Sequence, residues 1–342
     1  MHKILVAIRK VPLKLSGSLF VIFLILSVIV FEKGDLIKKI EVGNIKAIFD
    51  TTNNFLPYLY KTKALKYIFP ALMTICGLTY LIGRFYKERI ILIKHTSLNN
   101  DIAEVDSNFS KQYHISKTIQ ISQFDFMLDP KRYKEAIEVQ DTIVNEICQT
   151  RNKCKLGYYG IAHIPLIFRL GFNIGDENNT KLLHKRRNNE SFFEEFESTD
   201  DNSPLVKIDE LNKSKKSREL LVSIATSLII NENELSSLHY KDMHYLKFEG
   251  RFVDFDSVIS YKKAERLRNE IMIKIRQVCK KYGITKIHLV LASSCAFTFF
   301  LSQAFSRQHD PEIVVYHYLR GKYPWGIIAH EKPENAVVFN QN

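Results

Sequence analysis

The sequence predicts two membrane-spanning helices followed by a soluble α/β region that consists of two similar lobes. Two runs of 17 uncharged residues lie near the N-terminus, LSGSLFVIFLILSVIVF (15–31) and YIFPALMTICGLTYLIG (67–83). From residue 89 onward, short apolar segments alternate with amphipathic ones, which is typical of parallel strands connected by helices. This order of segments occurs twice in the chain, and one offset of 130 residues relates the two occurrences.

The two apolar runs are at the short end of the length that spans a bilayer, roughly 17–25 residues. Flanking Lys14, Lys66 and Arg84 can extend their charged groups to the membrane interface. A cleaved signal peptide would need small residues after the first run, but the chain there reads EKGDLIKK. A buried core helix stays open for the second run. We expect residues 1–88 to form a membrane region with helices over 15–31 and 67–83.

The distribution of charge supports contact with a membrane. The chain carries a net charge of +12, and its first 83 residues hold 11 Lys/Arg against 4 Asp/Glu. A basic chain suggests an anionic partner, which can be a nucleotide, a nucleic acid or a lipid surface. Residues 1–14 contain no acid, which favours a cytoplasmic N-terminus and returns the soluble region to the cytoplasm after two spans. The Lys-rich segment 32–66 weakens this argument for orientation.

The soluble region divides into a first lobe (89–197), a polar linker (198–218) and a second lobe (219–342). In each lobe an apolar strand is followed by an amphipathic helix, a second strand and a second helix. Asp129 and Pro130 are typical of a helix start, and Gly283 is typical of a helix end. The predicted strands are 89–95, 156–162, 219–225, 286–292 and 312–319, and the predicted helices begin at 129, 163, 261 and 293.

Small polar residues follow four of the predicted strands. In α/β sheets ligands bind at the carboxyl ends of strands, where helix N-termini offer free N–H groups to phosphate. We therefore expect the four strand ends to converge on one composite pocket between the lobes. The same hydroxyls are common helix caps, so capping alone is the simpler alternative at each position. The candidates are Thr96, Ser97, His163, Thr226, Ser227, Ser293 and Ser294.

Three aromatic residues at the end of the strand 312–319 or after it could stack on bases, and packing is the simpler alternative for each of them. They are Tyr318, Tyr323 and Trp325.

The sequence offers little for catalysis. The turn SSCAF (293–297) lacks the glycines of a nucleophile elbow, and HExxH, P-loop and GxGxxG motifs do not occur. The five cysteines show no zinc-ligand spacing and are typical of reduced cytosolic thiols. Asp254 and Asp256 form a weak acidic pair that is more typical of a strand end than of a metal site. We therefore predict no catalytic residue, no metal site and no cofactor, and a protein that is not an enzyme.

Several segments resemble a known family. The segments KIHLVLASSCAF (286–297), LSQAF (301–305), EIVVYHY (312–318) and KYPW (322–325) resemble the end of a SAVED domain. YYGIAHIPLIFRLG (158–171) and ILIKHTSL (91–98) resemble its first half. The resemblance implies two fused CARF-like, Rossmann-like lobes. One departure is the turn at 293–295, where family members often carry proline.

The resemblance also implies a function. SAVED domains sense cyclic di- or trinucleotides in the bacterial anti-phage system CBASS, where a nucleotidyltransferase makes the ligand. Two spans occupy the effector position here, which implies the two-transmembrane type, in the bacterial inner membrane with a cytoplasmic sensor domain. Ligand binding is then expected to drive homo-oligomerisation and to cluster the helices into a pore or membrane lesion that causes growth arrest or cell death.

Two other hypotheses belong to different classes. A membrane-tethered phosphodiesterase that degrades the same signal would need a metal-binding acid cluster or an activated histidine, and neither is visible in the sequence. A passive membrane anchor that recruits a partner fits the two apolar runs but leaves the expected pocket unexplained.

Overall fold

The computed structural model describes residues 87–340 apart from 151–153, 176–179, 188–191, 200–205 and 213–216, together with Thr74 and Gly77. The chain divides into two units, Met1–Lys87 and Glu88–Asn342. Both predicted membrane spans lie outside the described residues, except for the two isolated positions. Within the described part of the chain, no helix combines the length and apolarity that crossing a membrane requires. The two spans therefore stay a prediction.

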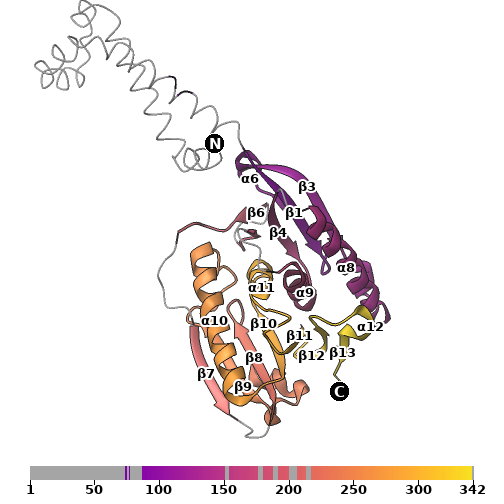
Figure 1. Ribbon diagram of the computed structural model, residues 1–342, viewed down its shortest axis with the longest axis vertical. Helices are drawn as coiled ribbons and strands as arrows, with labels where there is room; N and C mark the ends of the chain where they lie inside the picture. The colour runs from indigo at the N-terminus through magenta and orange to yellow at the C-terminus, as the bar shows by residue number, and fades with distance from the viewer. Residues whose placement is uncertain are drawn as a thin grey trace, which may run out of the picture. The chain divides into compact units, whose positions relative to one another are not determined.

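The first lobe contains a six-stranded sheet in the order β2-β6-β5-β4-β1-β3. The central strand β1 is buried on both faces, since Ile90 to Ile93 are at most 3% exposed. β1 runs parallel to β3 and β4 (Figure 1). β4 runs parallel to β5, whereas β6 is antiparallel to β5. The strands are β1 (Glu88–Thr96), β2 (Glu104–Val105), β3 (Tyr113–Ser122), β4 (Lys155–Ile161), β5 (Lys181–His184) and β6 (Phe192–Glu195).

The second lobe contains a seven-stranded sheet in the order β13-β12-β11-β10-β8-β9-β7. Four central strands, β9, β8, β10 and β11, are parallel. Antiparallel strands extend this sheet on both sides. The strands are β7 (Val206–Asn212), β8 (Glu219–Ala225), β9 (His244–Gly250), β10 (Lys286–Ala292), β11 (Glu312–Leu319), β12 (Lys322–Ile328) and β13 (Val337–Phe339).

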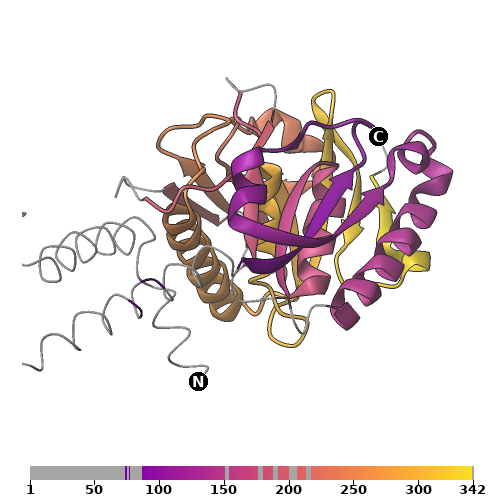
Figure 2. The ribbon, with the colours of Figure 1, turned by 90° about the horizontal axis from the view of Figure 1, so that it is seen from above.

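The predicted start signals coincide with helix beginnings in the structure, and the predicted stop signal coincides with a helix end. Ser260 caps α10 by accepting a hydrogen bond from the Lys263 N–H, and Gly283 ends it with a φ of 63°. Figure 2 shows α10 in brown and α8 in magenta on opposite sides of the second unit. The helices are α6 (Ser107–Gln112), α7 (Phe124–Met127), α8 (Tyr133–Thr150), α9 (Ile164–Ile174), α10 (Tyr261–Tyr282), α11 (Cys295–Ser302) and α12 (Pro333–Ala336), and the 3-10 helices are η2 (Pro130–Arg132), η4 (Glu232–Leu238) and η5 (Tyr240–Asp242).

The strand order confirms the internal repeat. The order β3-β1-β4-β5-β6 in the first lobe corresponds to β9-β8-β10-β11-β12 in the second. The turns repeat as well, because the N–H groups of Ser97 and Leu98 both donate to Ile161, and those of Thr226 and Ser227 both donate to Ala292. Ser97 thus corresponds to Thr226, and Ile161 corresponds to Ala292. The offset is one residue shorter than the predicted 130 for the first pair and one residue longer for the second.

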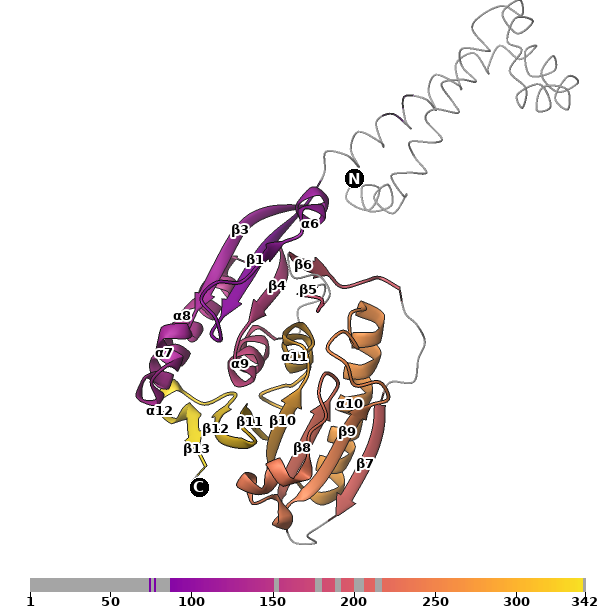
Figure 3. The ribbon, with the colours of Figure 1, turned by 180° about the vertical axis from the view of Figure 1, so that it is seen from behind.

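The two lobes share one hydrophobic core. The helices α9 and α11 lie side by side between the two sheets and connect the lobes within this core (Figure 3). The rings of Tyr158 and Phe299 are stacked with their centroids 4.1 Å apart. Gly171 allows the close approach of the two helices, because a Cβ there would lie 2.5 Å from the Phe299 carbonyl oxygen. The second unit is therefore held together across the junction between its lobes.

Three predictions about connections differ from the structure. The segment 113–122, which carried no strand prediction, forms β3, and 244–250 forms β9. The segment 198–218, predicted as a polar linker, contains β7, which pairs with β9 over its whole length. β11 is not the last strand, because β12 follows it directly and includes Tyr323 and Trp325. Each of these four strands is the edge strand of its sheet or the neighbour of an edge strand, where polar residues interrupt the apolar pattern.

Candidate ligand-binding site

A cavity of about 580 Å3 lies where carboxyl ends of strands from both lobes meet. The first lobe contributes residues at the ends of β4 and β5, and the second lobe contributes residues after β8, β10 and β11. The volume is within the range of small-molecule sites, about 300–1,000 Å3. This placement agrees with the general position of ligand sites in α/β sheets.

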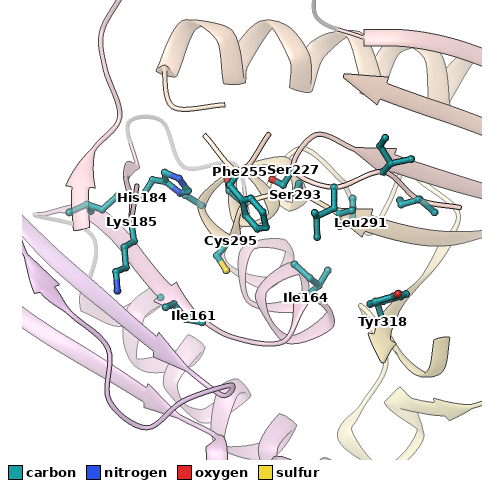
Figure 4. A pocket seen from close by; sticks show the side chains of 18 of the residues that line it. Ile161, Ile164, His184, Lys185, Ser227, Phe255, Leu291, Ser293, Cys295 and Tyr318 are labelled. Carbon is teal, nitrogen blue, oxygen red and sulfur yellow. The ribbon is translucent and has the colours of Figure 1, made fainter. Parts of the chain in front are cut away.

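The walls of the cavity are largely apolar and aromatic. Aliphatic side chains of Ile161, Ile164 and Leu291 surround its centre (Figure 4). Four aromatic residues also line it, and the two exposed ones, Phe255 and Tyr318, offer ring faces on which bases stack. The four are Phe193, Phe255, Tyr318 and Tyr323.

Hydroxyl groups are concentrated at the start of α11. Ser294 caps this helix, because its Oγ accepts a hydrogen bond from the Phe297 backbone N–H at 3.3 Å. The Ser293 hydroxyl lies 2.8 Å from the Thr298 Oγ1. A serine hydroxyl that accepts a hydrogen bond can still donate its own proton. Ser294 can therefore cap the helix and donate to a ligand oxygen at the same time.

The charged residues of the cavity come from different lobes. Lys185, directly after β5, is the one lysine or arginine among the described residues that line the cavity, and Glu234 on η4 is the one acid. His184 lies 2.8 Å from the Asp256 carboxylate of the second lobe. The Arg187 guanidinium packs 4.5 Å from the centre of the Phe255 ring. Contacts across the lobe boundary thus form the rim next to Lys185.

The structure brings five of the ten predicted site residues to the cavity. Those that line it are Ser227, Ser293, Ser294, Tyr318 and Tyr323, and those that do not are Thr96, Ser97, His163, Thr226 and Trp325.

The predicted residues of the first lobe form a separate buried cluster. The Ser97 hydroxyl lies 2.7 Å from the His163 Nδ1 and accepts the His163 backbone N–H at 2.7 Å. The His163 ring packs against His317 and Trp325 at centroid distances of 4.6 and 5.9 Å. Thr96 is fully buried. These residues are consequently turned toward the packed junction of the lobes and not toward the cavity.

The histidines of this junction are uncharged at neutral pH. Burial, and secondly the proximity of His317 and His95, lowers the pKa of His163 to about 3. Burial lowers the pKa of His317 to about 4. His163 therefore offers no positive charge to a phosphate.

The cavity contains one thiol, Cys295, at the first position of α11 (Figure 4). Burial raises its pKa, which disfavours the thiolate that nucleophilic attack requires. Among the described residues, Glu312, His330 and Glu331 bring three potential metal-ligand atoms within 4.8 Å of one another. They lie near the start of β11, away from the cavity, and the Lys286 ammonium already pairs with Glu312 at 2.9 Å.

Sequence reasoning missed several residues that line the cavity. Lys185 and Phe193 fall in or next to the polar stretch after β5, for which no strand and no site residue was predicted. Phe255 and Glu234 lie in connections after β9 and β8. One signal was available for Lys185, since the apolar pair Leu182–Leu183 directly before it indicates a short strand whose carboxyl end carries HKRR.

These observations define a two-lobed α/β protein with a ligand cavity at the strand ends of both lobes. The model of the SAVED family, described as the SMODS-associated and fused to various effectors sensor domain, matches residues 139–328. This match covers more than half of the chain, so the chain belongs to the SAVED family. The predicted recognition is confirmed at this level, whereas the two-transmembrane type stays a prediction.

The chain is also similar to solved receptors, whereas no curated protein sequence matches it. The Cap4 SAVED/CARF-domain containing receptor of Acinetobacter baumannii with the cyclic trinucleotide 2'3'3'-cAAA is 14% identical, with a TM-score of 0.48 over 75% of this chain and 54% of the receptor. The same receptor with 3'3'3'-cAAA is 14% identical, with a TM-score of 0.48 over 82% and 63%. The Cap4 receptor of Moraxella osloensis is 12% identical, with a TM-score of 0.42 over 76% and 58%. The chain thus spans less than two thirds of each of these receptors.

Proposed function

We propose that this protein is a membrane-anchored sensor of a cyclic di- or trinucleotide in the anti-phage system CBASS. The observation that carries the proposal is the cavity between the two lobes of a SAVED chain, which combines stacking rings, a helix start with hydroxyls and one lysine. Cyclic oligonucleotides present bases and phosphates in one compact ring. A site that recognises them needs aromatic rings for the bases and polar or positively charged groups for the phosphates. A nucleotidyltransferase supplies the ligand.

Each part of the cavity has a role in this proposal. The N-terminus of α11 and Ser294 bind a phosphate, because the helix start offers N–H groups and a positive dipole. Lys185 contributes the positive charge that the histidines of the lobe junction do not supply. The exposed rings of Phe255 and Tyr318 stack on bases. The protein is a sensor and not an enzyme in this proposal.

The apolar runs at 15–31 and 67–83 provide the effector part in this proposal. They span the bacterial inner membrane twice and leave the sensor domain in the cytoplasm. Bound ligand favours association of sensor domains, which clusters the spans into a pore or lesion that stops growth. The ligand drives this step only if it binds the associated state more tightly than the single subunit.

Reversing the charge of Lys185 tests the site. We expect Lys185→Glu to weaken binding of a cyclic trinucleotide about 10- to 100-fold. The substitution removes an attractive interaction with phosphate of about 1–3 kcal/mol and replaces it with a repulsive one. Isothermal titration of the full-length protein in detergent with 3'3'3'-cAAA and cyclic dinucleotides measures the change. Lys131→Glu is the matched control, since Lys131 is exposed and lies outside the cavity.

Three outcomes are informative for the Lys185 experiment. Ligand recovered intact after binding supports a sensor, whereas its breakdown would favour the phosphodiesterase hypothesis. If no cyclic nucleotide binds, the sensor proposal is wrong.

Deleting residues 1–83 tests the membrane mechanism. We expect the truncated protein to bind the ligand as the full chain does, and to lose toxicity in cells that produce the ligand. The measurement is growth after induction of the nucleotidyltransferase, with equal protein amounts checked by immunoblot. Toxicity that persists without residues 1–83 would contradict a mechanism based on clustered spans.

A further inference from the structure

Glu234 is an unexpected residue in a cavity for a phosphate-rich ligand. A carboxylate repels phosphate, and the repulsion grows as water is excluded. Lys185 and Tyr318, the hydrogen-bond partner of Glu234, lie at opposite ends of the cavity (Figure 4). The cavity is therefore polarised, with a positive end in the first lobe and a negative end in the second.

The carboxylate of Glu234 is held in place by two donors. Its Oε2 accepts the Asn231 backbone N–H at 3.2 Å, as part of a capping box at the start of η4. Its Oε1 accepts the Tyr318 hydroxyl at 2.9 Å. This hydrogen bond raises the pKa of Tyr318, so the phenol stays protonated and remains the donor. The side chain is thus fixed in orientation before any ligand arrives.

The fixed carboxylate retains capacity for further donors. An ionised carboxylate has about four acceptor positions, and the two hydrogen bonds use two of them. Phosphate groups have no N–H donor to offer, but the amine-bearing edges of adenine, guanine and cytosine do. Uracil and hypoxanthine lack an exocyclic amine and turn carbonyl oxygens toward such a site. The ring of Tyr318, which is 46% exposed and lies 5.5 Å from that of the buried Tyr323, provides a stacking face next to it.

We propose that Glu234, positioned by Tyr318, reads the base of the bound nucleotide by accepting hydrogen bonds from its exocyclic amine. The inference rests on the proposed function and adds the orientation and base class of the ligand. The phosphates face Lys185 and the start of α11, and an amine-bearing base faces Glu234. The acid that repels phosphate thereby excludes ligands placed in the opposite orientation.

Glu234→Gln separates base reading from helix capping. The single oxygen of glutamine satisfies the same capping box, and its amide nitrogen, which takes the place of Oε1, donates to the Tyr318 hydroxyl, which can accept, so the fold and η4 are preserved. It replaces one acceptor oxygen with an amide donor, which faces an exocyclic amine unfavourably. A residue that only caps η4 would show no change in base selectivity in this variant.

The experiment compares full-length wild-type protein with Glu234→Gln, using cyclic trinucleotides that contain only adenine, only hypoxanthine or only uracil. We expect the wild type to bind the adenine ring at least tenfold more tightly than the other two. Glu234→Gln is expected to reduce this ratio to threefold or less, with an unchanged unfolding temperature in the absence of ligand. Asp242→Asn, which removes one negative charge from the neighbouring η5 outside the cavity, is expected to keep the wild-type ratio.

Two results would overturn the inference while leaving the proposed function intact. One is a wild type that binds all three rings equally, and the other is a Glu234→Gln variant that gains affinity for all three by the same factor. The second result would mean that Glu234 acts only through its charge. If none of the three rings binds to either protein, the proposed function fails, and the base-reading role fails with it.

Discussion

Arg169→Ala is expected to lower the free energy of unfolding by about 3–5 kcal/mol, as the loss of one partner of a buried ion pair does. Arg169 is 2% exposed on α9 in the first lobe. Its Nη2 and Nε donate to the two oxygens of Asp141 at 2.7 and 3.3 Å. Its Nη1 donates to the carbonyls of Ile328 and Ala329 at 3.1 and 3.0 Å, at the end of β12 in the second lobe. One guanidinium thus joins the lobes.

The chain offers a matched control for this substitution. Arg132 pairs with Glu135 through a similar fork, but both side chains are more than 40% exposed. Arg132→Ala is therefore expected to cost less than about 1 kcal/mol. Urea unfolding followed by fluorescence measures both variants, because Trp325 is the single tryptophan and lies in the lobe junction. Equal effects of the two substitutions would show that Arg169 does not hold the lobes together.

The sequence predicted the central strands well because burial on both faces leaves a plain signal. β8, β10 and β11 begin and end at the predicted residues, and their central positions are fully or nearly fully buried. β3 was missed because most of its residues are exposed at a sheet edge, whereas β7 was missed because its polar residues pair with distant partners. Glu210 on β7, for example, accepts hydrogen bonds from Lys274 and Tyr282 of α10 at 2.8 and 3.0 Å. A charge paired across such a separation reads as a solvated loop in the sequence.

The candidate site was predicted better in the second lobe than in the first. The strand ends of both lobes were expected to be equivalent, and in the second lobe Ser227, Ser293 and Ser294 do line the cavity. In the first lobe Ser97 and His163 instead bond to each other. The additional strand β12 places Trp325 against His163, so that end of the sheet is covered. The predicted residues of the first lobe are absent from the cavity because β12, which the sequence did not reveal, covers their end of the sheet.

Acidification is expected to destabilise the unit Glu88–Asn342 steeply between pH 6.5 and about 4. Burial lowers the pKa of His95 to about 4, although its Nε2 lies 2.7 Å from the Gln123 Oε1 and that hydrogen bond opposes the shift. His317 and His163, with pKa values of about 4 and about 3, share this behaviour. The ordinary histidine pKa of about 6.5 applies to the unfolded chain. Below that pH the unfolded chain binds protons that the folded protein does not, so falling pH favours unfolding.

The size of this effect follows from the number of histidines. Each of these three contributes about 1.4 kcal/mol per pH unit between its unfolded and folded pKa values, which is a slope of about three protons near pH 5, and His288, whose pKa burial also lowers, adds to it. Urea unfolding of the full-length protein at pH 7, 6 and 5 measures the slope. His317→Phe, which keeps an aromatic ring against Trp325, is expected to reduce the slope by one proton. His114→Gln, at an exposed histidine of β3, is expected to leave it unchanged. A free energy of unfolding that stays constant from pH 7 to 5 would contradict the neutral state of these histidines in the folded protein. If both variants reduced the slope equally, the pH dependence of stability would not originate from His317.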